Sequence, residues 1–208
     1  MTIGKTFAAG NPCTGSTQYV QTSSAAPEPS YAVPAPGGVI TTMSTVAPGF
    51  AVSEDLIVYR FVSGTTYLVV GSTGLQPLNV NVSNPFATRI PVQAGDNLGI
   101  ATGPAGFNCA TNTLNTGDAF GNASGDPAVN TPQTLFGPFS GAFIDVAATV
   151  EPDADGDKFG DDTQDGCPTN AAIQTPCPAS APTTPQHRRC RKHRRLKRGK
   201  CVRRRHKR

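Results

Sequence analysis

The sequence predicts an all-β fold, a jelly-roll-like β-sandwich that is followed by an acidic segment and a basic tail. Glycine (22 residues) and proline (19) interrupt the 208-residue chain often, so that no helix-period run longer than about ten residues remains before the tail. Short runs of β-branched and aromatic residues alternate with turn signals, which is typical of a sandwich. The apolar runs all fall well short of the roughly 20 residues that a bilayer span needs.

The clearest predicted element is a β-hairpin. Residues 56–62 and 65–70 are rich in β-branched and aromatic side chains, which favour strands. Ser63 and Gly64 join the two runs, and a short glycine-containing connection of this kind is typical of a hairpin turn.

Further strands are predicted on both sides of this hairpin. Weaker strand patterns lie at residues 17–22 and 39–46, before the hairpin. After it, apolar and polar residues alternate over 86–92, and an Ala-Gly-Asp turn at 94–96 leads into an apolar run at 98–101. We expect these last two strands to form a second hairpin.

The rest of the predicted sandwich contains a long loop and a closing strand. Residues 101–136 are rich in Gly, Asn, Thr and Pro, so we expect mostly loop with one or two short strands. Residues 143–150 alternate, with Asp145 and Thr149 on the side that would face solvent. Residues 1–150 are long enough to bury a core and to fold as one domain.

Charge is distributed very unevenly along the chain. Residues 1–150 carry a net charge of −4, residues 151–186 carry −6, and residues 187–208 carry +14. The formal net charge of +4 therefore describes no part of the molecule.

Histidine is absent from the predicted folded body, since the three histidines are His187, His193 and His206. This excludes Ser-His-Asp and Cys-His catalysis and a histidine-bound catalytic zinc there. A paired-carboxylate hydrolase stays open, but we expect each candidate acid at a turn or on a solvent-facing side, and we expect no enzyme. Those acids are Glu54, Asp55, Asp96, Asp118, Asp126 and Asp145.

Aromatic residues that could stack on sugar rings are few. The chain has no Trp and four tyrosines, of which Tyr59 and Tyr67 lie in predicted strands and are expected in the core. A carbohydrate-binding module stays an alternative. The stretch Ile-Pro-Val-Gln-Ala-Gly-Asp-Asn-Leu-Gly at residues 90–99 resembles the jelly-roll-type sandwich modules of secreted bacterial proteins, a resemblance that specifies no ligand.

The six cysteines predict a disulfide framework. Two fall in each region of the chain, so we expect the pairs Cys13–Cys109, Cys167–Cys177 and Cys190–Cys201, with other connectivities open. Disulfides indicate an extracellular protein, and six free thiols in a reducing compartment are the alternative. No secretory signal precedes the body, so we expect that the N-terminus of the natural protein is missing.

The acidic segment predicts a calcium loop. Five aspartates crowd into 153–165, and a hard divalent cation taking about six to eight oxygen ligands would relieve their repulsion. Calcium fits this array better than magnesium, which favours fewer protein ligands, while a solvated acidic linker is the alternative. The expected ligands are the carboxylates of Asp153, Asp155, Asp157, Asp161 and Asp165 and the carbonyl of Phe159.

At these residues the chain resembles the thrombospondin type 3 repeat, an aspartate-rich calcium repeat that ends in Asp-x-Cys, often followed by Pro. The matching residues are Asp153, Asp155, Asp157, Asp161, Asp165, Cys167 and Pro168. The resemblance implies extracellular calcium binding in which the ion organises the backbone. Asp165 falls one residue later than in the family. Lys158 replaces a turn glycine, which predicts a positive φ at a cost of about 1 kcal/mol and an ammonium group near the cation.

A spacer and a basic tail end the chain. Residues 169–186 are rich in proline, which predicts an extended spacer that does not pack. We expect residues 187–208 to be disordered unless a polyanion or the Cys190–Cys201 bridge orders them. We do not expect the histidines and cysteines of the tail to form a zinc site, because their spacing is unusual for zinc ligands and the surrounding positive charges would repel the ion. The expected polyanion-binding residues are Arg188, Arg189, Arg191, Lys192, Arg194, Arg195, Lys197, Arg198, Lys200, Arg203, Arg204, Arg205, Lys207 and Arg208.

Together these features predict a secreted or surface-attached bacterial protein, adhesive or ligand-presenting. Its parts would be a sandwich (1–150), a calcium loop (151–168), a spacer (169–186) and a tail (187–208) that holds it to anionic envelope polymers. The combination resembles secreted proteins of Gram-positive soil bacteria. A carboxylate-based carbohydrate-active hydrolase and a nucleic-acid-binding protein that acts through the tail are the alternatives.

Overall fold

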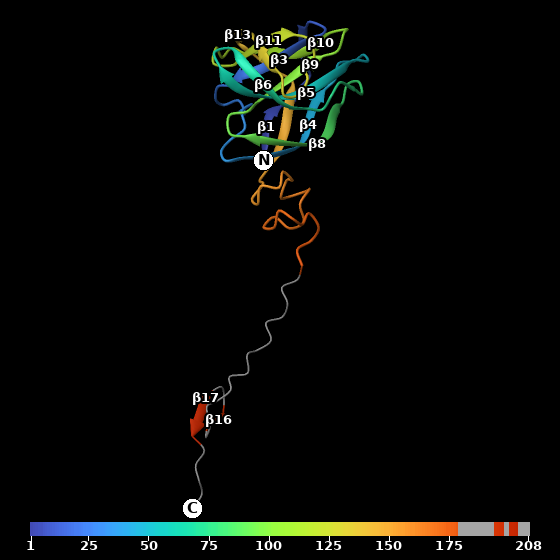
Figure 1. Cartoon of the computed structure of the whole chain (residues 1–208). Coiled ribbons are helices and arrows are strands. Elements are labelled where there is room, and N and C mark those ends of the chain that lie inside the picture. Colours follow the sequence, from blue (N-terminus) through green and yellow to red (C-terminus); the bar gives the residue numbers. More distant parts are fainter. Residues whose placement is uncertain (179–193, 198–199, 204–208) are drawn as a thin grey trace, which may run out of the picture. The chain divides into compact units, whose positions relative to one another are not determined.

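The computed structural model describes residues 1–178, 194–197 and 200–203, and the described residues form strands, turns and loops without a helix (Figure 1). The chain divides into two compact units, Met1–Cys177 and Pro178–Arg208. The named strands of the first unit pair antiparallel with their neighbours. The predicted all-β class is therefore confirmed.

Two large sheets face each other in the first unit. The smaller has the order β1-β15-β4-β8. Its strands are β1 (Thr2–Lys5), β15 (Val146–Glu151), β4 (Gly37–Val46) and β8 (Ser83–Gln93). A third, short sheet has the order β14-β10-β2, and its strands are β14 (Ala142–Ile144), β10 (Phe107–Asn112) and β2 (Asn11–Cys13).

The larger sheet is curled, with the order β12-β6-β5-β9-β3-β11-β13. Its edge strands, β12 and β13, are consecutive in the chain and are joined by Leu135, whose N–H donates to the Thr65 carbonyl. The curl thus brings its two edges together. The strands are β12 (Pro132–Thr134), β6 (Thr66–Ser72), β5 (Ser53–Ser63), β9 (Asn97–Thr102), β3 (Thr17–Ser23), β11 (Ala119–Ser124) and β13 (Phe136–Ser140), and β7 (Gln76–Pro77) pairs with β5.

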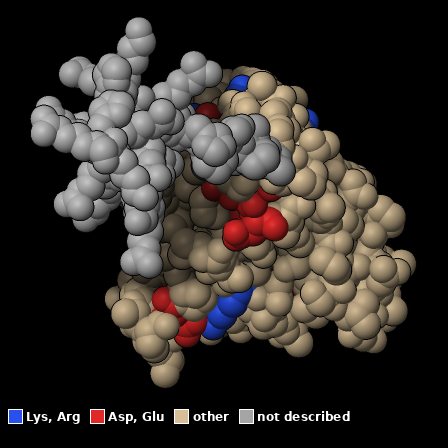
Figure 2. Space-filling view, turned by 90° about the horizontal axis from the view of Figure 1, so that it is seen from below, with Lys and Arg blue, Asp and Glu red and all other residues tan. Residues whose placement is uncertain are grey.

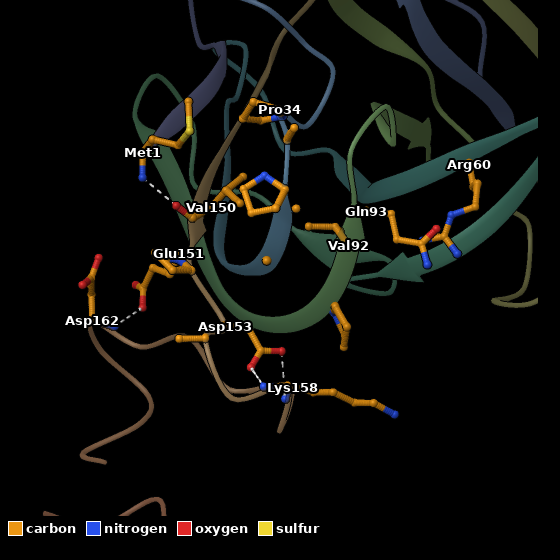
Figure 3. A pocket seen from close by; sticks show the side chains of 18 residues that line it. Met1, Pro34, Arg60, Val92, Gln93, Val150, Glu151, Asp153, Lys158 and Asp162 are labelled. Atoms are coloured by element: carbon orange, nitrogen blue, oxygen red, sulfur yellow. Dashed lines mark hydrogen bonds between the residues drawn. The ribbon is translucent and has the colours of Figure 1, made fainter. Parts of the chain in front are cut away.

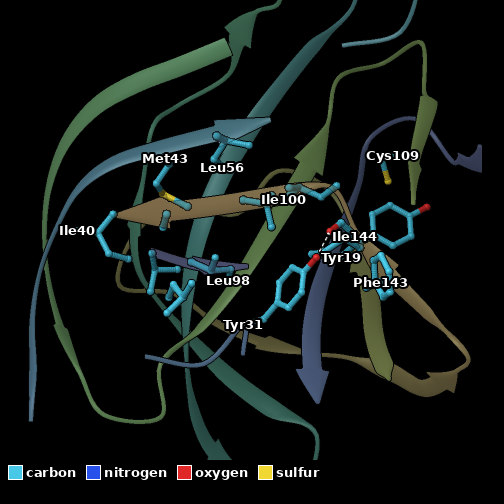
Figure 4. Packing of buried hydrophobic residues seen from close by; sticks show 14 of the residues in the cluster. Tyr19, Tyr31, Ile40, Met43, Leu56, Leu98, Ile100, Cys109, Phe143 and Ile144 are labelled. Carbon is cyan, nitrogen blue, oxygen red and sulfur yellow. Dashed lines mark hydrogen bonds between the residues drawn. The ribbon is translucent and has the colours of Figure 1, made fainter. Parts of the chain in front are cut away.

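The main hydrophobic core lies between the facing sheets (Figure 4). Ile40 and Met43 of β4 and Leu56 of β5 are fully buried there, and burial of such side chains is the main favourable term in folding. Tyr31 enters from a loop and donates its hydroxyl proton to the Ile144 carbonyl at 2.8 Å, so the buried phenol is satisfied.

A second, smaller core fills the inside of the curl. Ile57 and Tyr59 of β5, Tyr67 and Val69 of β6, and Leu135 belong to it. Strand β5 is therefore buried on both faces over 56–59, which explains why its sequence is continuously apolar and does not alternate.

One predicted hairpin is confirmed and the other is wrong. Strands β5 and β6 pair as predicted. Strands β8 and β9 do not pair, because β8 joins β4 in the smaller sheet while β9 joins β5 and β3 in the curled sheet. The turn between them does form, and Asp96 accepts hydrogen bonds from the Gln93 N–H and from the guanidinium of Arg60 on β5. This ion pair fixes the turn to the curled sheet, so the chain crosses between the sheets there.

The segment 101–136 holds more strand than the sequence predicts, with β10, β11 and the short β12. The disulfide Cys13–Cys109 ties β10 to β2 across 96 residues of sequence. Pairing with distant strands thus compensates for the low strand propensity of this region.

The predicted closing strand is interrupted at Asp145, which separates β14 from β15. Ile144 and Val146 are buried in the core as expected, but Asp145 does not face solvent. It is 1% exposed and accepts the backbone N–H groups of Phe7 and Val46, both at 2.9 Å.

The prediction that the carboxylates of the sandwich lie at turns or on solvent-facing sides is wrong for three of the six, Glu54, Asp55 and Asp145, whereas Asp96 and Asp118 do lie at turns. Of the six, only Asp126 is exposed. The other five are buried, because several satisfy backbone or hydroxyl donors inside the fold; Asp118, for example, accepts the Ala25 N–H at 2.8 Å and the Thr113 hydroxyl at 2.7 Å. They are Glu54, Asp55, Asp96, Asp118 and Asp145.

The second unit contains one described element. Strands β16 (Arg194–Lys197) and β17 (Lys200–Arg203) form an antiparallel hairpin within the basic tail. Five of the predicted polyanion-binding residues lie in it, and the others lie outside the described residues. Those five are Arg194, Arg195, Lys197, Lys200 and Arg203.

Candidate metal centre

The acidic loop follows β15 directly and is fixed to the sandwich by Glu151, the last residue of that strand. Glu151 is 3% exposed. Its Oε2 accepts the N–H groups of Asp162 (3.1 Å) and Thr163 (2.9 Å), and its Oε1 accepts the hydroxyls of Thr163 (2.7 Å) and Thr41 (2.8 Å). Burial opposes ionisation, but these hydrogen bonds outweigh it and lower the pKa of Glu151.

A second attachment joins the loop to β8. The amide Nε2 of Gln164 donates to the Thr88 carbonyl at 2.7 Å. Nearby, the guanidinium of Arg89 lies 4.1 Å from the centre of the Phe159 ring, a cation–π contact. The loop is thus held by β15, β4 and β8 of the smaller sheet.

Three of the predicted ligands converge at the start of the loop. Asp153, Asp155 and Asp157 each offer a carboxylate oxygen, and these oxygens lie within 4.8 Å of one another. Backbone N–H groups hold the carboxylate of Asp153, from Gly156 at 2.9 Å and from Lys158 at 3.1 Å. Three acidic side chains fixed at this separation could hold a metal ion.

Asp161 lies close to the same group. Both oxygens of its carboxylate are 3.2 Å from the Ala154 N–H. Its pKa is raised, first by burial and then by the charges of Asp153, Asp155 and Asp165. Mutual repulsion of this kind is the condition that a bound cation relieves.

Two buried carboxylate oxygens in the loop lack a hydrogen-bond partner among the described residues. They are Oδ2 of Asp155 and Oδ2 of Asp165. Asp165 is 6% exposed, and its other oxygen accepts the Cys167 N–H at 2.8 Å. A buried polar atom without a partner is costly, so these two oxygens are the strongest local indication of a ligand.

The sixth predicted ligand, Phe159, contributes its backbone. Its N–H donates to Oδ1 of Asp157 at 2.9 Å. None of the turn and loop hydrogen bonds found among the described residues uses its carbonyl oxygen, so that oxygen stays available to a cation.

Lys158 has the positive φ that the sequence predicts, at 71°. The side chain extends away from the carboxylate of Asp153 (Figure 3). It lines a cleft of about 1000 Å³ between the loop and the end of the sandwich, together with Arg60, Gln93 and residues 34–38. The ammonium group of Lys158 therefore does not lie beside the Asp153 carboxylate.

The chain after the loop folds back onto it. The disulfide Cys167–Cys177 closes this segment, and the amide Nε2 of Gln174 donates to Oδ2 of Asp157 at 2.8 Å. The prediction of an unpacked spacer is thus wrong for residues 169–177, because the disulfide and Gln174 return the chain to the loop. Two of the three predicted disulfides are confirmed, and Cys190 of the third lies outside the described residues.

The end of the molecule that carries the loop is shown in Figure 2. Where this face is uncovered, the acidic side chains lie in separate groups on a mostly uncharged surface, and a basic side chain lies beside one of them.

The described ranges contain no helix that could cross a membrane.

Comparison with known proteins adds no assignment, since no family model, curated protein or solved structure matches this chain. The chemistry of the site therefore has to be argued from its own geometry.

Proposed function

We propose that the loop 153–165 binds one calcium ion. The observation that carries this proposal is the pair of unpartnered, buried carboxylate oxygens on Asp155 and Asp165, within a group of five aspartates. Calcium accepts many oxygen ligands in irregular geometry, whereas magnesium requires a tight octahedron. A loop that offers five carboxylates and a carbonyl suits the larger ion.

The ion would stiffen the end of the sandwich. Asp153 and Asp161 lie in the same short segment as Gln164 and as the backbone groups that Glu151 binds. Through Glu151 and Gln164 this segment is connected to β15, β4 and β8 of the smaller sheet. Calcium bound only by the folded loop would therefore stabilise the whole first unit through linkage.

We propose further that the protein is extracellular and presents its sandwich at an anionic surface. Two disulfides are consistent with an oxidising compartment. The 14 basic residues of the tail, with no acid among them, favour attachment to any polyanion by release of counterions. The sandwich would then serve as an adhesive or ligand-presenting module.

Calorimetric titration of the full chain with calcium and with magnesium tests the metal proposal. We expect calcium-specific heat that is abolished in the double variant Asp155→Asn/Asp157→Asn, because two central ligands lose their charge. Asp162→Asn is the control for a change of charge in the loop. It removes one charge from the same loop at an exposed residue outside the ligand set, so binding should persist.

Equal heats for both metals, or unchanged calcium binding in the double variant, would show that the aspartates form a solvated acidic segment. Loss of binding in the Asp162→Asn control would show that bulk negative charge, and not the ligand geometry, attracts the ion.

A further inference from the structure

An isolated carboxyl group lies in the main core. Glu54 of β5 is 0% exposed, and neither of its carboxyl oxygens has a hydrogen-bond partner among the described residues. Its position on the strand places it on the same face as Leu56 and Val58, between the two sheets. An ionised carboxylate without a partner is strongly unfavourable there, and burial raises the pKa of Glu54 well above its usual range.

A second carboxyl group lies nearby and is well partnered. Asp145 accepts the Phe7 N–H on Oδ1, and the Val46 N–H and the Thr45 hydroxyl on Oδ2, the last at 3.3 Å. Burial nevertheless outweighs these hydrogen bonds and raises the pKa of Asp145 to about 7. Its negative charge in turn raises the pKa of Glu54 further.

Thr45 lies near both acids. Its hydroxyl is fully buried and donates to Asp145, and it also lies near enough to Glu54 to oppose part of the rise in that residue's pKa, although no hydrogen bond joins Thr45 to Glu54. A hydroxyl has a single proton, so Thr45 cannot donate to both carboxyl groups at once, but its oxygen can also accept a hydrogen bond. A protonated Glu54 is the donor that this arrangement lacks.

We infer that Glu54, Thr45 and Asp145 form a buried proton-binding site that joins the two facing sheets and makes the sandwich less stable when the proton leaves. The protonated Glu54 would donate to Oγ1 of Thr45, and Thr45 donates to Asp145. Glu54 belongs to β5 of the curled sheet, Thr45 to β4 of the smaller sheet, and Asp145 to the junction of β14 and β15.

Other charged groups near the site do not neutralise it. Asp55 adds negative charge beside Glu54. Tyr31 lies near Asp145, and burial raises the pKa of its phenol, so it carries no charge. Lys5 of β1 is paired with Glu28. Neither ion pair of the described residues includes a member of the proton-binding site.

The direction of the pH effect follows from the raised pKa values. A group whose pKa is higher in the folded than in the unfolded state stabilises the fold fully below its unfolded value, about 4 for carboxyl groups, and loses that contribution as pH rises through the folded value. For Asp145 this loss is complete above about pH 7, and Glu54 contributes in the same direction because its pKa is also raised. The sandwich should therefore become less stable from acidic to alkaline pH.

Urea unfolding of the full chain in excess calcium, at about pH 5, 7 and 9, tests this inference. Over the pH range in which the folded state binds one more proton than the unfolded state, the equilibrium constant for unfolding rises about tenfold per pH unit. We expect such a rise in the wild type, and we expect Glu54→Gln to abolish it between about pH 7 and 9 because the amide is neutral at every pH. Glu28→Gln, which removes a carboxyl group of the surface ion pair, should keep the wild-type dependence.

A pH dependence that is the same in Glu54→Gln and in the wild type would overturn the proposal. A second measurement needs no variant. Unfolding of the wild type in weakly buffered solution at about pH 8 should release one proton, because Glu54 ionises only in the unfolded chain. Absence of that proton would equally reject the site, whether or not the loop binds calcium.

Discussion

In Lys158 the backbone and the side chain have different roles in the loop. Its φ of 71° lies in the left-handed region, as does the 79° of Gly156 two residues earlier. The backbone N–H of Lys158 donates to Asp153, so the strained conformation serves to hold a proposed ligand. The side chain extends away from that ligand into the cleft.

Replacing Lys158 with glycine should stabilise the calcium-loaded protein by at most about 1 kcal/mol, because glycine adopts positive φ without steric cost. Urea unfolding in excess calcium measures the change. Lys158→Ala is the matched control, since alanine removes the ammonium but keeps the strain. If alanine stabilised the protein as much as glycine, the charge and not the backbone would be the cause.

Spacing along the sequence predicted the aspartates of the candidate site but not the residues that hold them. Asp153, Asp155 and Asp157 are separated by single residues, and such a local pattern is visible in any sequence. Glu151 and Gln164 act through partners on β4 and β8 that are far away in the chain. Nothing in their own neighbourhood distinguishes them from ordinary polar residues.

Local sequence signals predicted where strands form better than they predicted which strands pair with each other. The Ser63-Gly64 turn joins two strands that pair with each other, so the hairpin was predictable. The turn at 94–96 has equally good turn residues, yet the ion pair Arg60–Asp96 directs the next strand into the other sheet. Which sheet a strand joins is thus decided by contacts that the strand pattern does not contain.

The two disulfides close loops of very different length, so removing each one should lower the free energy of unfolding by a different amount. Cys13–Cys109 closes a loop with a sequence separation of 96, and Cys167–Cys177 one of 10. Loop-closure entropy gives about 4–5 kcal/mol for the first and about 3 kcal/mol for the second. We expect the double Ser variant of the first pair to unfold at a lower urea concentration than that of the second. The reverse order would show that fixing the acidic loop contributes more than closing the long loop.

On the scale of the whole chain, opposite charges occupy opposite parts of the sequence. Residues 1–186 carry 4 basic and 14 acidic side chains, and residues 187–208 carry only basic ones. An anionic surface would attract the tail and repel the rest of the protein. Attachment should therefore depend on the tail alone.

Deleting residues 187–208 should release the protein from anionic envelope polymers or from a sulfated-polysaccharide resin. Raising salt from about 50 to 200 mM should weaken binding of the intact chain strongly, because log affinity falls with log salt in proportion to the charges neutralised. Cosedimentation or column retention measures both effects. Retention of the truncated chain at high salt would identify the sandwich as the anchor, and a preference of more than about tenfold for one nucleic-acid sequence would favour a nucleic-acid-binding protein.

The attachment of the acidic loop to β8 also affects the tendency of this protein to aggregate at high concentration. Strand β8 is an edge of the smaller sheet and spans Ser83–Gln93, long enough to template pairing with a strand of another molecule. Pro85 and Pro91 remove backbone donors from it, and Gln164 occupies the Thr88 carbonyl. A loop held in place by a cation would thus prevent β8 from pairing with a strand of another molecule. Removal of the cation would then both lower the stability of the protein and favour aggregation through extension of the smaller sheet.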